Sequence, residues 1–214
     1  VIGFSDMIQA ETFGPVGDDR YATYLRDINE SGQLLLSLID VVLDISKIEA
    51  GKFDLIETEV DVPAFLQRSI KLISPQANDR HITLELECDD QAPALLCDQR
   101  PLSQIVNNLL SNAIKFSDEG QTISIKSSFD TTRGYVIRVT DDGIGMDETD
   151  IHKALEPFSQ ADASRARNQE GTGLGLYVSR LLMGQHGGTL EIDSAPDEGT
   201  TVTVTFPPER IINS

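Results

Sequence analysis

The residues best suited to chemistry begin with two asparagines in the stretch NLLSNAIKF (108–116). Asn108 and Asn112 are four positions apart, so on a helix they point the same way from adjacent turns, with Lys115 close by. An amide oxygen is a hard ligand that suits Mg²⁺, and a lysine can meet a phosphate as a point charge. Taken alone, the pattern fits equally well a pair of helix asparagines that are hydrogen-bonded to nearby backbone.

A second group of candidate residues is DDGIGM (141–146), directly after a predicted strand. The carboxylate of Asp141, placed at a strand end, can accept a hydrogen bond from an exocyclic amine such as that of adenine. Gly143 and Gly145 would let the backbone approach a ligand closely. By itself this stretch also fits an ordinary acidic turn.

A third group is GTGLGL (171–176), which leads into a predicted helix. Glycines before a helix N-terminus create an anion site from free N–H groups and the helix dipole. The dinucleotide fingerprint is excluded because its last glycine would fall on Leu176, and the sequence contains no P-loop. The polar segment 159–170, with Arg165 and Arg167, is interpreted as a lid over a phosphate tail, although a plain disordered loop explains it equally well.

Elements that position these groups are indicated by hydrophobic spacing. Residues 1–11 and 19–50 predict a helical hairpin broken at 13–17. The stripe of the second helix follows alternating steps of four and three: Tyr21, Leu25, Ile28, Gly32, Leu35, Ile39 and Val42. Two helices cannot enclose this stripe, which predicts a homodimeric four-helix bundle. The alternative is that the hairpin packs only on its own second domain.

Beyond residue 52 the pattern predicts strands and helices in alternation. Asp61 and Asp98 are suited to cap two of the helices. The expected strands are 53–60, 82–86, 95–97, 122–129, 135–140, 189–194 and 201–206. The expected helices are from Asp61 to about residue 78, from Asp98 to 116, and 174–185. Hairpins near the end favour an α+β sandwich over a doubly wound parallel sheet. The predicted domains are therefore 1–52 and 53–214.

Composition limits the partners. The formal net charge of −18 argues against general nucleic-acid binding. No run approaches the roughly 18 apolar residues that span a bilayer, so no membrane contact is expected of this piece. Any site for an anion must be compensated locally by Mg²⁺, lysine or backbone N–H groups.

Taken in order, these groups resemble the N, G1, F, G2 and G3 boxes of the histidine-kinase ATPase domain, the Bergerat-type nucleotide-binding sandwich shared with gyrase, Hsp90 and MutL. LEPF (155–158) would be the F box and EGTT (198–201) the G3 box. IDVVLDISKIEAGK (39–52) resembles the second helix of the kinase dimerisation domain, and GFSDMIQAETFGPVGDDRY (3–21) most resembles PleC/DivJ-type kinases. The resemblance implies a mixed sheet covered by helices on one face.

The resemblance also implies roles for individual residues. Asn112 would ligate Mg²⁺, with Asn108 on the phosphate side, Lys115 would contact phosphate, and Asp141 would bind the adenine amine. Gly143 and Gly145 would line the base pocket, and Thr200 would sit behind the adenine. Gly171, Gly173 and Gly175 would shape the lid and its hinge. The remaining residues expected around the nucleotide are Phe116, Met146, Thr172, Leu174 and Leu176.

Two departures from the family pattern bear on mechanism. Relatives that hydrolyse ATP carry a Glu where this chain has Asn108, a poor general base, which favours phosphoryl transfer over hydrolysis. The family's phosphoacceptor motif, H-E-x-x-[TN]-P, is expected upstream of Val1, because His81, His152 and His186 do not match it. A lid Arg is often found where this chain has Gln160, so Arg165 or Arg167 would have to replace it.

The resemblance therefore predicts a protein-histidine kinase that uses Mg-ATP and passes the phosphoryl group to an Asp of a response-regulator receiver. The receiver would dock on the hairpin, which would also form the homodimer. The expected location is the cytoplasm, including as the cytoplasmic part of a membrane-anchored sensor. The alternative is a pseudokinase scaffold that binds nucleotide and lacks a phosphoacceptor histidine.

Overall fold

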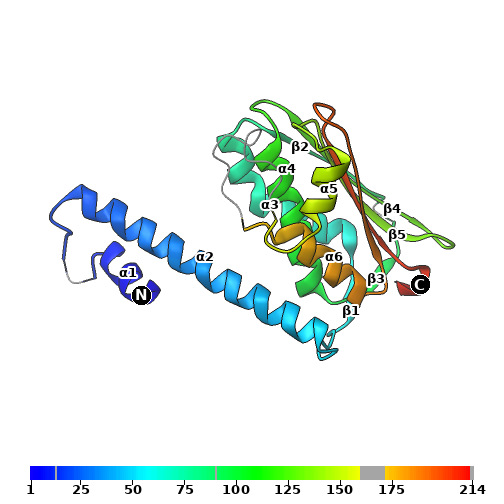
Figure 1. Cartoon of the computed structure of the whole chain (residues 1–214), viewed down its shortest axis with the longest axis horizontal. Coiled ribbons are helices and arrows are strands. Elements are labelled where there is room, and N and C mark those ends of the chain that lie inside the picture. Colours follow the sequence, from blue (N-terminus) through cyan, green and yellow to red (C-terminus); the bar gives the residue numbers. More distant parts are fainter. Residues whose placement is uncertain (13, 90, 160–171, 213–214) are drawn as a thin grey trace. The chain divides into compact units, whose positions relative to one another are not determined.

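The computed structural model describes residues 1–12, 14–89, 91–159 and 172–212. The chain divides into two compact units, Val1–Lys52 and Phe53–Ser214, called here the hairpin unit and the sheet unit. The hairpin unit contains helices α1 and α2, and the sheet unit combines helices with strands (Figure 1). In the described part of the chain, no helix has both the length and the apolar character needed to cross a membrane.

In the hairpin unit, α1 (Ile2–Gln9) packs against the long helix α2 (Asp19–Glu49). Asp18 begins α2, because its carboxylate accepts a hydrogen bond from the Arg20 N–H at 2.9 Å. The two helices approach closely at Gly32, where a Cβ atom would lie 2.8 Å from the Ile2 side chain. The predicted helical hairpin is confirmed.

The apolar stripe of α2 is largely uncovered in the single chain. Leu35 exposes 60% of its surface, Ile39 47% and Val42 43%. Side chains of this kind are normally buried against another element. The four-helix homodimer that would cover them stays a prediction.

The sheet unit is built on a five-stranded sheet with the strand order β2-β4-β5-β7-β6. Its strands are β2 (Thr83–Glu87), β4 (Thr122–Asp130), β5 (Gly134–Asp141), β6 (Thr189–Ser194) and β7 (Thr200–Phe206). Strands β2 and β4 pair in parallel, and the other neighbours pair antiparallel. The predicted α+β sandwich with a mixed sheet is confirmed.

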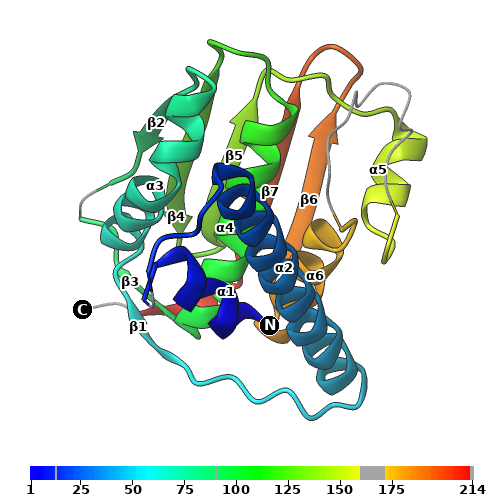
Figure 2. The ribbon, with the colours of Figure 1, turned by 90° about the vertical axis from the view of Figure 1, so that its left-hand side faces the viewer.

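Helices α3 (Val62–Asp79), α4 (Gln99–Phe116) and α6 (Gly175–Gln185) cover one face of this sheet (Figure 2). Alternation along the strands explains the single covered face. Ile123, Ile125 and Ile137 are fully buried under the helices. Lys126 and Arg138, which follow Ile125 and Ile137 along the strands, are exposed. The short helix α5 (Glu148–Ala154) lies beside β6, and sequence periodicity did not predict it because most of its residues are polar.

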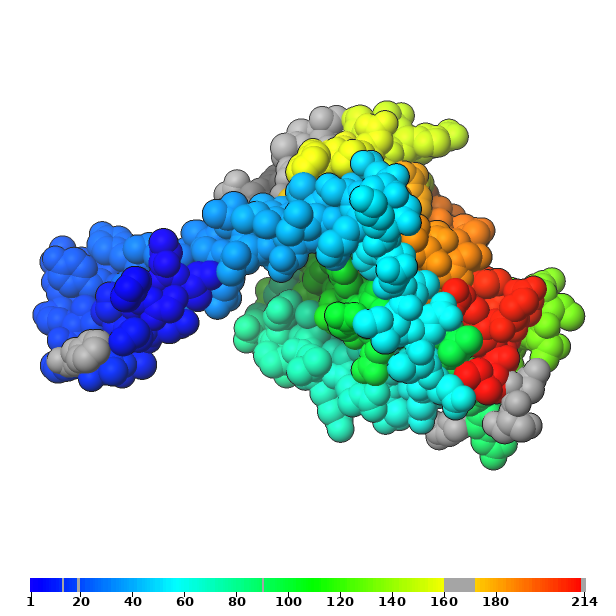
Figure 3. Space-filling model, turned by 90° about the horizontal axis from the view of Figure 1, so that it is seen from below, coloured from blue at the N-terminus to red at the C-terminus, as the bar shows by residue number. Residues whose placement is uncertain are grey.

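A second, three-stranded sheet joins β1 (Thr58–Val60), β3 (Ala94–Cys97) and β8 (Ile211–Ile212). In the space-filling view the red C-terminal residues lie beside the cyan residues that open the sheet unit (Figure 3). The 3-10 turn η1 (Pro208–Arg210) precedes β8, and neither was predicted.

The expected strand over 53–60 is wrong for its first five residues, since β1 begins at Thr58. The reason is the length of its partner. Strand β3 ends at Cys97, because the next residue, Asp98, caps α4. Cys97 pairs with Thr58, so β1 has no partner before Thr58 in this strand. The N–H of Ile56 therefore donates to the Asp98 carboxylate at 2.8 Å and not to a neighbouring strand.

Candidate functional site

Helix α4 holds the two candidate asparagines. Its apolar face, which includes Leu102, Ile105 and Leu109, is buried against the sheet unit's core, and this fixes which way its polar residues point. The Asn108 amide nitrogen donates to the Gly175 carbonyl at 3.1 Å and to Ser179 Oγ at 3.3 Å. Asn108 thus joins the middle of α4 to the start of α6.

Asn112, one turn further along α4, is half-buried, and its amide makes no hydrogen bond to any residue that the structure describes. Its oxygen is therefore open to a ligand. Lys115 Nζ lies 4.8 Å from the centroid of the Phe116 ring, and burial lowers the pKa of this ammonium below its usual range. The structure accordingly supplies a hard oxygen and a partly desolvated cation on one end of α4.

The C-terminal end of α4 is held by Arg80, a residue that the sequence analysis did not single out. Its guanidinium donates to the carbonyls of Ile114 and Lys115, and to that of Ser117 at 3.0 Å. These are carbonyls that a helix end leaves without intrahelical partners, and a cation there also complements the helix dipole. Arg80 therefore fixes the part of α4 that carries Lys115 and Phe116.

Asp141 ends strand β5 opposite Thr200 of β7 and exposes only 7% of its surface. One carboxylate oxygen accepts a hydrogen bond from the Gly143 N–H at 3.0 Å. Burial raises the pKa of Asp141 to about 6, although the N–H groups of Gly143 and Thr200 act in the opposite direction. A buried carboxylate with spare acceptor capacity is suited to bind one amine donor of a ligand.

The turn after Asp141 packs directly on the end of α4. The Ile144 N–H donates to the Phe116 carbonyl at 3.3 Å, and a Cβ atom at Gly143 would lie 2.3 Å from the same oxygen. Gly145 has a φ of +61°, and a Cβ atom there would lie 1.8 Å from the Ala195 carbonyl oxygen. Both glycines are therefore required by close backbone approaches.

Ser194, at the end of β6, connects the remaining candidates and was also missed. Its hydroxyl accepts a hydrogen bond from the Met146 N–H at 2.9 Å, donates to the Gly199 carbonyl at 2.8 Å and lies 2.9 Å from Thr200 Oγ1. The turn over 143–146 and the turn before β7 are thus held together by one side chain.

Gly173 and Gly175, two glycines of the third group, lie at the start of α6. Gly173 has a φ of +66°, and a Cβ atom there would lie 2.4 Å from the Ser159 carbonyl oxygen. Leu174 is buried and no side chain caps the helix, so the first N–H groups of α6 are left for another acceptor. Thr172 and Leu176 are half-buried beside them. Gly171, Gln160, Arg165 and Arg167 lie outside the described residues.

Helix α4 is therefore the common support of the candidate site. Its middle contacts the start of α6 through Asn108, and its end contacts the turn after β5 through Phe116. Strand pairing then brings Thr200 beside Asp141. A depression of about 400 Å³, lined by Glu87, Lys126 and Arg138 among others, is separate from this site, because no candidate residue lines it.

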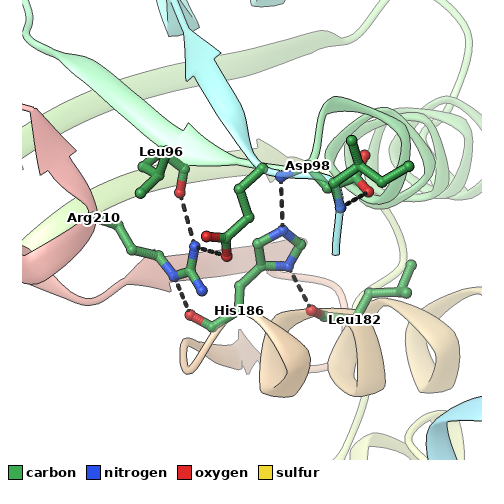
Figure 4. Close-up of polar contacts among 7 residues, drawn as sticks. Leu96, Asp98, Leu182, His186 and Arg210 are labelled. Atoms are coloured by element: carbon green, nitrogen blue, oxygen red, sulfur yellow. Dashed lines mark hydrogen bonds and ion pairs between the residues drawn. The ribbon is translucent and has the colours of Figure 1, made fainter. Parts of the chain in front are cut away.

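None of the three histidines adjoins the site residues through a hydrogen bond that the structure describes. His186 is fully buried, and burial lowers the pKa of its imidazole. Its Nε2 accepts from the Asp98 N–H at 3.2 Å, which places the proton on Nδ1, 2.8 Å from the Leu182 carbonyl (Figure 4). His81 and His152 lack such burial. His186 is therefore a structural residue.

Comparison with known proteins shows which family the chain belongs to. Residues 97–210 match the family described as histidine kinase-, DNA gyrase B-, and HSP90-like ATPase. The cell-division control histidine kinase PdhS of Brucella ovis is 39% identical over 220 residues, covering 99% of this chain and 21% of PdhS. The chain thus spans about a fifth of the length of such curated relatives.

Two solved structures are similar to the whole chain. Full-length ShkA in complex with AMPPNP superposes with a TM-score of 0.83 and 26% identity, covering 100% of this chain and 43% of ShkA. The Acinetobacter baumannii histidine kinase AdeS superposes with a TM-score of 0.72 and 19% identity, covering 96% of this chain and 94% of AdeS, a likeness of fold alone. The match over residues 97–210 establishes that the chain belongs to the histidine kinase-, DNA gyrase B-, and HSP90-like ATPase family.

Proposed function

We propose that the sheet unit binds Mg-ATP and is the catalytic part of a protein-histidine kinase. The observation that carries the proposal is the arrangement around α4. The open amide of Asn112 and the ammonium of Lys115 lie on the same helix, and the uncapped start of α6 is bonded to that helix. The buried carboxylate of Asp141 lies beyond its end. The relative ShkA was solved with the ATP analogue AMPPNP, which supports the same ligand here.

In this proposal Asn112 would hold the Mg²⁺, and Lys115 and the first N–H groups of α6 would bind phosphate oxygens. Asp141 accepts a hydrogen bond from the adenine amine, and Gly143, Gly145, Met146 and Thr200 surround the base. Mg²⁺ supplies charge neutralisation, and the protein positions the γ-phosphoryl group.

Transfer is favoured over hydrolysis by the state of Asn108. An amide has no useful basicity, and its nitrogen is already bonded to Gly175 and Ser179. Asn108 is therefore not suited to activate water as a general base. We propose that the acceptor is a histidine of the full-length protein that precedes Val1, and that an Asp of a response-regulator receiver accepts the group next.

The hairpin unit is proposed to be the remnant of the dimerisation domain, on which the receiver docks near α1 and the first half of α2. The support is the exposed apolar stripe of α2, which a second copy would cover. The relatives PdhS and AdeS are histidine kinases by name.

The test is autophosphorylation of the native protein, extended upstream of Val1, with γ-labelled Mg-ATP. We expect a label that is acid-labile and alkali-resistant, and that Asn112→Asp or Lys115→Ala abolishes. Asn107→Asp is the matched control, because Asn107 is exposed on the same helix and outside the site. Nucleotide binding without any label would instead establish the pseudokinase scaffold, and steady phosphate release would establish a hydrolytic ATPase.

A further inference from the structure

Arg210, next to the C-terminus, ties together three separate parts of the sheet unit (Figure 4). Its Nε donates to the His186 carbonyl at the end of α6. One terminal nitrogen donates to the Leu96 carbonyl of β3 at 2.9 Å and to the Glu57 carboxylate at 2.7 Å. The side chain of Arg210 is only 16% exposed. This largely buried guanidinium therefore holds the end of α6 against the segment that enters the sheet unit.

Asp98 continues the same set of contacts toward α4. Its N–H donates to His186 Nε2 at 3.2 Å, and its two carboxylate oxygens accept the N–H groups of Arg100 and Ile56. Asp98 exposes 4% of its surface and His186 none. The first residue before α4 and the first residue after α6 are thus directly bonded.

These contacts place α4 and α6 side by side in opposite directions, attached at two points. One attachment is Asp98 to His186, and the other is Asn108 to Gly175 and Ser179. The first turn of α6 carries the open N–H groups of the proposed phosphate site, and the second attachment joins it to the helix of Asn112. A displacement at the far end of α6 therefore changes the distance between two parts of that site.

We propose that Arg210, acting with Glu57 and His186, is a positioning residue that sets the placement of α6 against α4 and thereby the affinity for nucleotide. This inference rests on the proposed function. Because Glu57 belongs to the segment that directly follows the hairpin unit, the same contacts link that segment to the nucleotide site. Arg210 touches no ligand in this scheme and acts through the main chain of His186.

The experiment compares Arg210→Met with Arg138→Met in the chain as it stands. Arg138 is an exposed arginine on the uncovered face of the sheet, where it bonds Thr203. Affinity for Mg-ATP is measured by titration calorimetry, and amide hydrogen exchange is followed over residues 172–179. We expect Arg210→Met to weaken binding about three- to tenfold and to speed exchange at the start of α6, with no change for Arg138→Met.

Two further variants distinguish a role of Arg210 in positioning α6 from a role in stability alone. Glu57→Gln removes one ion pair and leaves both carbonyl contacts of Arg210, so it should fold normally and show a smaller change of the same sign. Arg210→Lys keeps the charge but cannot make the forked set of bonds, and should restore only part of the affinity. A lower melting temperature in Arg210→Met with unchanged affinity and unchanged exchange in α6 would overturn the proposal.

A failure of the proposed function would give a different result from a failure of the positioning role of Arg210. If the wild-type chain bound no nucleotide, the kinase assignment would fail, while the exchange rates of α6 in Arg210→Met would still report whether Arg210 positions this helix. Unchanged exchange would refute the positioning role in that case as well.

Discussion

In the hairpin unit the buried side chains that the structure describes are polar, Ser5 and Asn29, whereas the buried set of the sheet unit is mostly aliphatic. Asn29 donates to Asp6 at 2.5 Å and accepts from Gln33 at 2.7 Å, while the apolar stripe of the same helix is exposed. The sheet unit closes its own core, with residues such as Leu102 and Ile137 fully buried. The sheet unit thus buries its own apolar residues, whereas the exposed stripe of the hairpin unit supports the proposed homodimer.

The prediction with the largest expected effect tests whether the apolar stripe of the hairpin unit forms a homodimer. Leu35→Asp combined with Ile39→Asp should convert a homodimer to a monomer at micromolar concentration. Each lost side chain removes about 1.5–3 kcal/mol of apolar burial, and each occurs twice in a dimer. Sedimentation equilibrium measures the change, and the melting of the sheet unit should be unaffected.

The matched control for this experiment is Glu30→Gln with Asp40→Asn, which alters exposed polar residues of the same helix. It should leave the dimer intact. A double aspartate variant that remained dimeric would show that the stripe is not the contact surface.

The second prediction tests how tightly the sheet unit is packed. Gly145→Ala should lower its free energy of unfolding by about 3 kcal/mol or more, since a Cβ atom would meet the Ala195 carbonyl oxygen at 1.8 Å. Gly120 also has a positive φ, of +83°, but nothing lies within 4 Å of a Cβ atom there. Gly120→Ala should therefore cost only the backbone strain, about 1–2 kcal/mol.

Urea denaturation followed by circular dichroism measures both variants. The difference between them isolates the steric contact from the cost of a positive φ. Equal losses would mean that the turn over 143–146 can move away from Ala195, and that the sheet unit is less closely packed than its buried residues indicate.

Arg80 gives the third prediction, because it holds the end of the helix on which the site is built. Arg80→Met should lower the free energy of unfolding by about 1.5–3 kcal/mol, the usual range for a hydrogen bond to a charged group. It should also weaken Mg-ATP binding, since Lys115 and Phe116 lose their fixed position. Arg68→Met, an exposed arginine on α3, is the control. An affinity equal to that of the wild type would limit Arg80 to a role in stability.

Most of the sheet unit was predictable from local signals. Asp61 and Asp98 do cap α3 and α4, and the strand over 189–194 was placed correctly. These signals are short-range, involving caps, alternation and glycine turns. Strand β1 was predicted too long because its first residue depends on where β3 ends. This limit is non-local, since Thr58 pairs with Cys97, 39 positions further along the chain.

The residues of the candidate site that belong to local motifs were predictable from the sequence. The residues that hold these motifs in place through contacts far away in sequence were not. Asn112, Lys115 and Asp141 stood out by type and spacing. Arg80, Ser194 and Arg210 did not, because each acts through contacts with backbone far away in sequence. A lone arginine or serine carries no periodic or spacing signal that distinguishes it from a surface residue. The roles of the motif residues toward a nucleotide stay predictions.

The smallest expected effect concerns the protonation of Asp141. Burial raises the pKa of this carboxyl group to about 6. Because this pKa lies above the unfolded value of 3.8, the folded state is favoured below pH 3.8 by this group and loses that advantage as the pH rises to about 6. At pH 7.5 the empty protein therefore carries a buried charge that Asn would remove. Asp141→Asn should raise the free energy of unfolding by about 1–2 kcal/mol, measured by urea denaturation.

The same group should behave oppositely toward ATP. A carboxylate accepts the adenine amine well and a protonated acid poorly, so wild-type affinity should fall as the pH drops below about 6, by up to tenfold per pH unit. Asp141→Asn should bind weakly with no such dependence, as calorimetry at pH 5.5 and 7.5 would show. A stabilised variant with weakened binding would mean that the sheet unit, although closed and complete, keeps one unfavourable buried charge for its ligand. If Asp141→Asn lost stability instead, the carboxylate would belong to the fold, and the adenine contact would have to be sought elsewhere.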